Sequence, residues 1–230
     1  MDAPAKPRLL PLGDAALLLE FGTHIDVAVN ARVLAAWRAI EASHLRGVHD
    51  VVPAYASLAV HFDPLQWNAD SLGERLLEVS SAVIPETPAP RCVDVPVCYD
   101  PEFAPDIARV SAHTGLSADE VVRRHAGAAY RVFFLGFTPG FPYLGGLDPA
   151  LATPRHDSPR SRVPAGSVAI GGVQTGIYPM ATPGGWQIIG RTPLRLFDAA
   201  REPCCLLAPG DSLRFFTISD AEFRRLEAAD

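Results

Sequence analysis

Three arginines and a histidine lie close together late in the chain. Arg155, Arg160 and Arg162 fall within eight residues, with His156 among them, and two prolines restrict the backbone of the same segment. Arginine can bind a carboxylate or a phosphate through two parallel hydrogen bonds, and a restricted loop loses less entropy when the anion binds. The segment is therefore a candidate anion-binding site. The alternative is a solvated basic loop in which nearby acids such as Asp157 pair with the arginines.

A second candidate motif follows some twenty residues later. Gly184 and Gly185 precede Trp186 and Gln187, and Arg191 closes the motif. Consecutive glycines allow the backbone to approach a ligand or to adopt positive φ, and successive N–H groups in such a turn can form a nest for an anion. We include all five residues among the candidates for binding substrate or phosphate. The alternative, which this motif alone favours, is a tight turn before a strand with the indole in the core.

Aromatic residues and prolines near both motifs are candidates for the wall of a pocket. Small-molecule sites are mostly apolar with a few placed polar groups, and Phe137, Pro139, Phe141 and Tyr178 could form such a wall or equally belong to a core. No catalytic template is found: the chain lacks a G-x-S-x-G elbow and an H-E-x-x-H metal pair, so the catalytic residues stay unknown and no metal site is expected. Its single lysine, Lys6, also rules out a phosphate-binding loop of the G-x-x-x-x-G-K-[ST] type.

Composition excludes several classes of protein. The 230 residues are 48% hydrophobic and 20% charged, as in an ordinary soluble globular protein, and the net charge of −6 argues against nucleic-acid binding. No apolar run approaches the roughly 20 residues of a membrane span, and the first residues lack a signal-peptide pattern, so we expect a cytoplasmic protein that binds neither membrane nor nucleic acid. Four cysteines without paired C-x-x-C spacing are expected to be free, buried thiols, with Cys204 and Cys205 in the core.

The first part of the chain predicts a small α+β domain. Short apolar runs alternate with amphipathic ones, which is typical of helices packed on a short antiparallel sheet. The predicted strands cover 15–21, 48–52 and 55–62, and the predicted helices cover 26–43 and 70–83. Three prolines within 84–90 then indicate a semi-rigid linker. We accordingly predict two domains, at 1–86 and 87–230.

The second part predicts a β-barrel or sandwich. A strand at 91–97 is followed by helices at 105–114 and 117–125, the latter with Ser117 as N-cap and Glu120 in a capping box. Short β-type runs separated by glycine- and proline-rich turns then dominate the chain. These runs cover 130–135, 167–170, 186–189 and 212–216. The fold class is therefore α+β, with a small N-terminal α+β domain followed by a β-barrel domain.

Several longer motifs, in order along the chain, resemble one known family. The four longest cover 134–143, 154–168, 174–179 and 183–193, and shorter matches begin at Gly13 and Pro209. Together they resemble the B subunit of 5-oxoprolinase, a family also called PxpB or KipI and formerly allophanate hydrolase subunit 1. The resemblance spans nearly the whole chain. Several ordered motifs that agree form a far more specific signal than any one of them.

The resemblance implies a fold, an activity and partners. It implies that the barrel is cyclophilin-like, and that the chain acts with the A and C subunits of 5-oxoprolinase to convert 5-oxo-L-proline, ATP and water into L-glutamate, ADP and phosphate. ATP is consumed by the complex and bound either by this chain or by one of its partners. Preorganised arginines and backbone N–H groups suit such chemistry, so we expect Arg155, Arg160, Arg162 and the turn at Gly184 to bind substrate or phosphate at a site shared with the C subunit. Substitution of Arg162 is expected to lower the activity.

Two other functions stay open. The KipI name belongs to inhibitors of sporulation histidine kinases, so the chain could be a binding protein without catalysis. Related domains in urea amidolyase transfer a carboxyl group from biotin to urea, so the chain could be the carboxyltransferase-like subunit of an allophanate or urea amidolyase system. In that case biotin would arrive on another protein, because this chain has no lysine segment to accept it.

Overall fold

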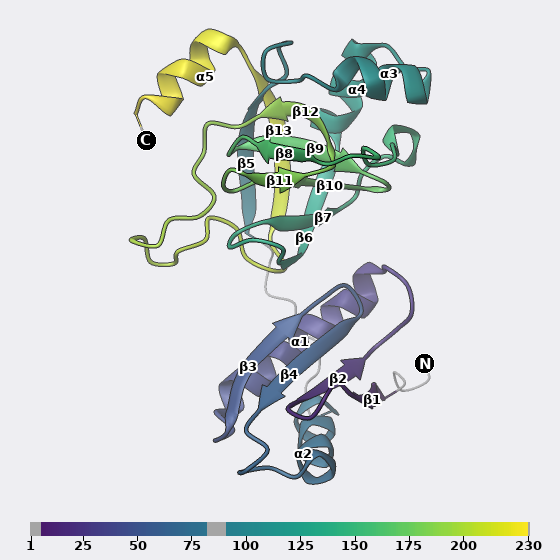
Figure 1. Ribbon diagram of the computed structural model, residues 1–230, viewed down its shortest axis with the longest axis vertical. Helices are drawn as coiled ribbons and strands as arrows, with labels where there is room; N and C mark the ends of the chain where they lie inside the picture. Colours follow the sequence, from purple (N-terminus) through teal and green to yellow (C-terminus); the bar gives the residue numbers. More distant parts are fainter. Residues whose placement is uncertain (1–5, 82–90, 230) are drawn as a thin grey trace. The chain divides into compact units, whose positions relative to one another are not determined.

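The computed structural model describes residues 6–81 and 91–229, which fall into two compact units (Figure 1). Each unit has its own buried hydrophobic core. The predicted linker at 84–90 and the predicted domain boundary between residues 86 and 87 lie outside the described residues.

The N-terminal unit is a four-stranded antiparallel sheet, in the order β1-β2-β4-β3, with two helices. Its elements are β1 (Arg8–Pro11), β2 (Ala16–Glu20), α1 (Val27–Ser43), β3 (Val48–Pro53), β4 (Ser57–Phe62) and α2 (Ala69–Ser81). The three predicted strands and both helices are confirmed. β1 was not predicted, because its four residues end in proline and lie at the edge of the sheet, where proline is tolerated.

Local sequence explains α1. The Asp26 side chain accepts a hydrogen bond from the Val29 N–H at 2.9 Å, which caps the helix as the acidic residue before an amphipathic run is expected to do. Val33, Ala36 and Ile40 recur at helical spacing and are buried. They pack in one cluster with the buried residues of the sheet.

The C-terminal unit is built on a closed barrel of seven strands, in the order β10-β7-β6-β13-β5-β12-β9 (Figure 1). The strands are β5 (Cys92–Cys98), β6 (Ala129–Leu135), β7 (Pro142–Gly145), β9 (Ser167–Gly171), β10 (Gln174–Ile177), β12 (Gln187–Arg191) and β13 (Ser212–Ile218). The first and last strands of the unit, β5 and β13, pair in parallel over their whole length, and β10 pairs with β9 to close the ring. The predicted barrel is confirmed.

Shorter elements surround this barrel. They are α3 (Ile107–Thr114), α4 (Ala118–Gly127), a 3₁₀ turn at Pro149–Leu151, α5 (Asp220–Glu227) and a ribbon of β8 (Arg160–Val163) and β11 (Thr182–Gly184). Helices α3 and α4 were predicted. The strands β7, β8, β10 and β11 were not, because three or four residues are too few to show an alternating pattern. Helix α5 was also not predicted.

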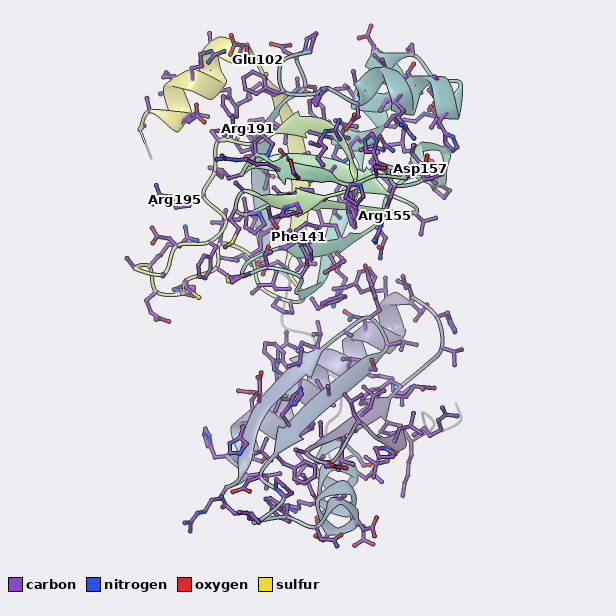
Figure 2. The ribbon with its side chains drawn as sticks, in the orientation of Figure 1. Glu102, Phe141, Arg155, Asp157, Arg191 and Arg195 are labelled. Atoms are coloured by element: carbon purple, nitrogen blue, oxygen red, sulfur yellow. The ribbon has the colours of Figure 1, made fainter. Side chains whose placement is uncertain are left out.

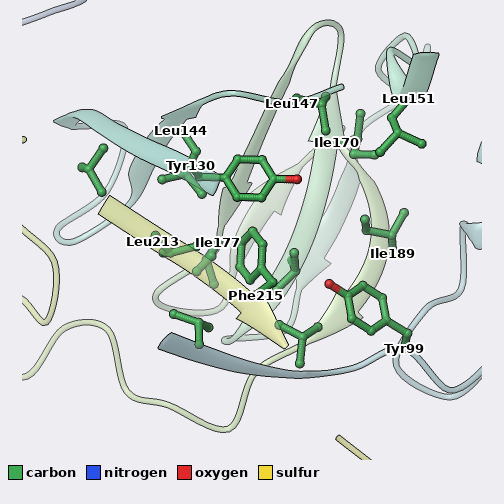
Figure 3. Packing of buried hydrophobic residues seen from close by; sticks show 14 of the residues in the cluster. Tyr99, Tyr130, Leu144, Leu147, Leu151, Ile170, Ile177, Ile189, Leu213 and Phe215 are labelled. Atoms are coloured by element: carbon green, nitrogen blue, oxygen red, sulfur yellow. The ribbon is translucent and has the colours of Figure 1, made fainter. Parts of the chain in front are cut away.

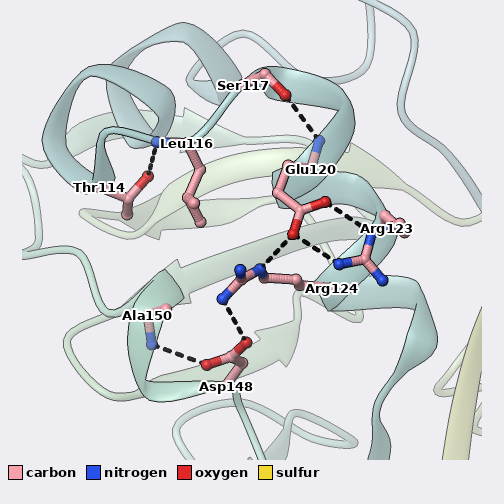
Figure 4. A network of polar contacts seen from close by, with 8 residues as sticks. All are labelled: Thr114, Leu116, Ser117, Glu120, Arg123, Arg124, Asp148 and Ala150. Carbon is pink, nitrogen blue, oxygen red and sulfur yellow. Dashed lines mark hydrogen bonds and ion pairs between the residues drawn. The ribbon is translucent and has the colours of Figure 1, made fainter.

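Helix α4 begins at the predicted cap. The Glu120 N–H donates to the Ser117 hydroxyl at 3.2 Å. The Glu120 carboxylate accepts hydrogen bonds from Arg123 and Arg124, and Arg124 also donates to Asp148 beside the 3₁₀ turn (Figure 4). The polar face of the helix is therefore tied to the loop after β7.

The two faces of the barrel strands contribute to two different hydrophobic clusters. On β9, Val168 and Ile170 belong to the barrel interior, which Figure 3 shows around Tyr130 and Phe215. Ala169, between them, belongs to a smaller cluster that is mainly aromatic. This alternation follows from the period of two along a strand. The candidate site lies at the smaller cluster.

Cysteine placement differs from the prediction. Cys98 is buried, but Cys92 and Cys204 are exposed and Cys205 is partly exposed, so the prediction of a core cysteine pair is wrong. The reason is that Cys204 and Cys205 lie in a loop outside the barrel strands, where Cys205 forms an isolated bridge with Phe197. No helix in the described part of the chain is long and apolar enough to cross a membrane.

Candidate functional site

A pocket of about 280 Å³ opens beside the barrel at the smaller cluster. Aromatic side chains make up half of its lining, and the loop before β8 and the ribbon strand β11 complete it. The lining residues are Phe137, Phe141, Tyr143, Arg155, Pro159, Tyr178, Pro183, Gly184, Gly185 and Trp186. Of the predicted wall residues, Phe137, Phe141 and Tyr178 line this pocket. Pro139 does not, because it lies exposed in the turn between β6 and β7.

The aromatic walls hold one another in edge-to-face contacts. The Phe141 ring lies 5.3 Å from Tyr178 and 5.6 Å from Trp186, in both cases nearly perpendicular to the partner ring. Such contacts favour one fixed arrangement of rings over a fluid apolar surface. The pocket therefore presents a preformed aromatic surface to a ligand.

Glycine is required where the backbone and these rings approach closely. A Cβ atom at Gly171 would lie 2.5 Å from the indole of Trp186, and one at Gly184 would overlap the Tyr178 hydroxyl. Neither Gly184 nor Gly185 has a positive φ, so of the two roles that consecutive glycines allow, a positive φ is not the one used here. Gly184 has no room for a side chain because Tyr178 occupies that space, whereas a Cβ at Gly185 would make only ordinary contacts with His156 and Pro159.

Arg155 is the positively charged residue of the lining. Its guanidinium carbon lies 5.4 Å from the centre of the Trp186 ring, in a cation–π contact, and the side chain is exposed. No carboxylate partner of Arg155 is present among residues 6–81 and 91–229. The stacked guanidinium therefore keeps its hydrogen-bond donors available for an anion.

Two tyrosine hydroxyls lie near this charge. Burial raises the pKa of both Tyr143 and Tyr178, and Arg155 acts on both pKa values in the opposite direction. The Trp186 backbone also acts to lower the pKa of Tyr178. Because the net pKa shift is upward, both phenols stay protonated at neutral pH and can donate a hydrogen bond. One guanidinium and two hydroxyls against aromatic walls suit a small organic anion with a flat body.

His156 and Arg160 do not reach the pocket. Arg160 Nη2 donates to Asp106 Oδ1 at 2.6 Å, and His156 Nε2 lies 3.3 Å from Asp106 Oδ2. Arg160 therefore binds this buried carboxylate and also His156, and neither side chain lines the pocket. Of the predicted anion-binding arginines, Arg155 lines this pocket and Arg160 does not, because neighbours in sequence point to different environments.

Three further candidates also lie elsewhere. Arg162 is exposed on β8 outside the lining. Gln187 is fully buried, and its amide nitrogen donates to the Pro154 carbonyl at 2.7 Å, so it fixes the start of the loop. Arg191 donates to the Ala165 carbonyl and pairs with Glu227 of α5, and Figure 2 shows it well apart from Arg155. These three residues therefore lie outside the lining, and no contact with a ligand in this pocket is proposed for them.

Sequence reasoning missed Asp106 and Tyr143. Tyr143 belongs to the motif at 134–143, and its place two residues after Phe141 on a strand could have identified it. Asp106 lies 54 residues from the arginine that it binds, and no local pattern connects them. Only the tertiary fold brings Asp106 beside Arg160.

Phe137 has a strained backbone at the rim of the pocket. Its φ is +65° and its side chain is 61% exposed, a rare combination for a bulky residue. We expect Phe137→Gly to be more stable than Phe137→Ala by about 1 kcal/mol, because only glycine relieves the left-handed strain, while both lose the ring. Urea unfolding of the two variants measures this difference. Equal stability would mean that Phe137 carries no strain.

A nucleoside triphosphate does not fit this lining. Triphosphate sites combine several cationic and backbone donors with residues that hold Mg²⁺. The lining here contains one arginine, no lysine and no carboxylate. Its chemistry matches a single negative charge on an apolar body.

Comparison with known proteins gives one consistent family. The family model for the carboxyltransferase domain, subdomain C and D, matches residues 7–207. The chain is 41% identical over 226 residues to the B subunit of 5-oxoprolinase from Bacillus subtilis (strain 168), a match that covers 92% of this chain and 93% of that protein. It is 44% identical over 214 residues to the B subunit of 5-oxoprolinase from Escherichia coli O157:H7, covering 91% and 95%.

Solved structures share the fold. The crystal structure of TTHA0988 superposes with a TM-score of 0.80 at 40% identity over 89% of this chain, which spans 40% of that longer chain. The Kluyveromyces lactis urea amidolyase shares the fold at 21% identity, with a TM-score of 0.77 over 96% of this chain and 15% of its own. Since the family model matches most of the chain and two relatives exceed 40% identity over nearly their full length, the chain belongs to the 5-oxoprolinase B-subunit family of carboxyltransferase-domain proteins.

Proposed function

We propose that this chain is one component of an ATP-dependent 5-oxoprolinase, which opens 5-oxo-L-proline to L-glutamate together with the A and C subunits. Membership of the B-subunit family supports the activity. The observation that carries the assignment of a site is the aromatic pocket with the unpaired guanidinium of Arg155 stacked on Trp186. We place the complex in the cytoplasm, where ATP is available.

The substrate has the chemistry that this pocket offers. 5-Oxoproline is a flat five-membered lactam with one carboxylate. In our proposal the carboxylate accepts two hydrogen bonds from Arg155, and the ring lies against Phe141 and Trp186. The protonated hydroxyl of Tyr178 is then available to the lactam oxygen. In this arrangement both polar ends of the substrate are held, which fixes the orientation of the amide bond in the pocket.

The composition of the lining indicates which tasks of the reaction belong to the partner subunits. An unstrained lactam resists hydrolysis, so ATP is needed to activate its oxygen, yet the lining does not fit a triphosphate. It also contains no carboxylate, histidine or lysine that could act as a general base. We therefore propose that one of the partner proteins binds ATP and supplies the catalytic groups, and that this chain alone is inactive.

Reconstitution tests the proposal. The A and C subunits mixed with this chain are expected to hydrolyse ATP only when 5-oxoproline is present and to release glutamate in equal amount. An unchanged rate when this chain is omitted would sink the proposal. Calorimetry on this chain alone tests the site separately: 5-oxoproline is expected to bind, whereas Mg–ATP at the same concentration is expected to give no heat of binding.

Carboxyl transfer is the second candidate, because the matching family model describes a carboxyltransferase domain. In that reaction the anion held by Arg155 would be the carboxyl group in transit. The two functions separate in one assay. Carboxybiotin consumption that depends on this chain and on an amide acceptor, without glutamate formation, would favour carboxyl transfer over ring opening.

A further inference from the structure

Asp106 is a buried acid that connects several elements of the barrel unit. Its side chain is 6% exposed and lies outside the pocket lining, just before α3. Oδ1 accepts a hydrogen bond from Arg160 Nη2 at 2.6 Å, and Oδ2 accepts one from the Ile188 N–H at 2.7 Å. The Asp106 N–H also donates to the Ile188 carbonyl at 3.0 Å. One residue thus fixes both polar groups of the Ile188 backbone and the guanidinium of Arg160.

Each of these contacts leads to the pocket. Ile188 lies two residues after Trp186 and packs in the same aromatic cluster. Arg160 follows a lining proline and pairs with Gly184 in the ribbon. Asp106 therefore joins the strand that carries the indole to the far end of the loop that carries Arg155.

His156 completes the link. Its backbone N–H donates to the Gly185 carbonyl at 2.7 Å, directly beside Arg155. Arg160 Nη1 lies 2.9 Å from His156 Nε2, and since a guanidinium can only donate, Nε2 accepts and the ring proton is on Nδ1. In this tautomer the 3.3 Å approach of Nε2 to Asp106 is not a hydrogen bond, so His156 is held by Arg160.

The Asp106 carboxylate is charged. Burial acts to raise its pKa, but the hydrogen bonds from Arg160 and Ile188, together with the neighbouring His156, outweigh burial and leave the pKa below its ordinary value. A buried charge that loses its partner is strongly unfavourable, so Arg160 cannot leave without disrupting the cluster. This makes the link between the loop and the strand rigid.

We infer that Asp106 is a positioning residue of the pocket. It holds the loop at 154–160 and the strand after Trp186 at a fixed separation, and this separation keeps the guanidinium of Arg155 stacked on the indole. Its effect on 5-oxoproline rests on the proposed function. The geometric claim does not, because it concerns only the order of the loop.

The kinetic test uses Asp106→Asn in the complete complex of this chain with the A and C subunits. Asparagine keeps the shape but offers one acceptor for two donors, so the KM for 5-oxoproline is expected to rise about fivefold with little change in kcat, as for a weakened uniform binding contact. In the Arg155→Ala background the same change is expected to leave KM unaltered, because the group that Asp106 positions is gone. A fivefold rise in both backgrounds would overturn the inference.

Controls separate this inference from the proposed function. Asp94→Asn breaks an exposed pair with Arg214 in the same unit and is expected to leave KM unchanged. Amide hydrogen exchange of the free chain is the readout without ligand: His156 and Ile188 are expected to exchange faster in Asp106→Asn, with the amides of β2 unchanged. Wild-type exchange at His156 and Ile188 would overturn the inference even if Arg155 binds 5-oxoproline. Faster exchange together with an Arg155→Ala complex of normal KM would instead count against the proposed site alone.

Discussion

Replacing Arg155 with alanine is expected to raise the KM of the reconstituted complex for 5-oxoproline about 30-fold while leaving the KM for ATP unchanged. The substitution removes a charge-assisted, two-pronged hydrogen bond to the substrate carboxylate, worth about 2 kcal/mol, and 1.4 kcal/mol corresponds to a factor of ten. The KM for ATP is expected to stay unchanged because the lining of the pocket does not match a triphosphate. Steady-state kinetics with each substrate varied in turn measures both constants.

Two other substitutions make this result specific. Arg155→Lys keeps the charge but loses the planar fork and its stacking on Trp186, so an intermediate loss is expected. Arg162→Ala removes an exposed arginine of β8 from outside the lining and is expected to have no effect on either KM. Arg160→Ala is not a suitable control, because it would leave the buried Asp106 carboxylate unpaired. Equal losses in Arg155→Ala and Arg162→Ala would point to a diffuse basic surface in place of a pocket.

The aromatic half of the site could be predicted from the sequence, but the charged half could not. Phe141 and Tyr178 lie in short motifs rich in glycine and proline, and such turns bring rings together near the end of a strand. The three arginines lie within eight residues, yet one stacks on an indole, one binds Asp106 and one is exposed. Their directions depend on contacts with α3 and β12, which no local pattern encodes.

The same limit explains what was missed in the fold. Helix α1 and the strands β5, β6 and β13 are long enough for their periodic patterns to be read. The ribbon of β8 and β11 pairs across some twenty residues through strands of three and four residues, with a change of register between them. Closure of the barrel depends on the parallel pairing of the first and last strands of the unit, which lie about 120 residues apart. Such pairing is decided by packing rather than by propensity.

His125 gives the second large expected effect, on stability. It is fully buried in the barrel interior, and Thr175 donates to the Ala169 carbonyl, so the Thr175 oxygen accepts from His125 Nε2 at 3.0 Å. Nδ1 is then the acceptor for the Tyr99 hydroxyl at 2.8 Å. The neutral ring thus satisfies both nitrogens, and there is no place for a second ring proton. Burial accordingly lowers the pKa of His125 to about 3.

This lowered pKa makes the barrel sensitive to acid in a defined range. The unfolded chain takes up a proton on His125 near its ordinary value of 6.5, whereas the folded chain does so only near 3, so the unfolded state binds more protons between these values. The contribution of the neutral His125 ring to the free energy of unfolding is therefore fully present above pH 6.5 and is lost as the pH is lowered toward 3. Between pH 7 and pH 4.5 the loss from this residue is about 2 to 3 kcal/mol. The lowered pKa of Asp106 contributes mainly below that range, because carboxylates titrate near pH 4 when unfolded.

Urea unfolding at pH 7 and pH 4.5 isolates the contribution of His125 when three proteins are compared. His125→Gln is expected to be less stable than the wild type at pH 7, since the amide fits the network less well, but to lose about 2 to 3 kcal/mol less on acidification because it has no proton to gain. His113→Gln, which removes an exposed histidine of α3, is expected to follow the wild type at both pH values. Each variant has its own change in the free energy of unfolding between the two pH values. When these changes are subtracted, the contributions of the other titrating groups, including those of the N-terminal unit, cancel. A wild-type pH dependence in His125→Gln would show that the buried ring already accepts a proton in the folded barrel, and Nδ1 would then donate to the Tyr99 hydroxyl rather than accept from it.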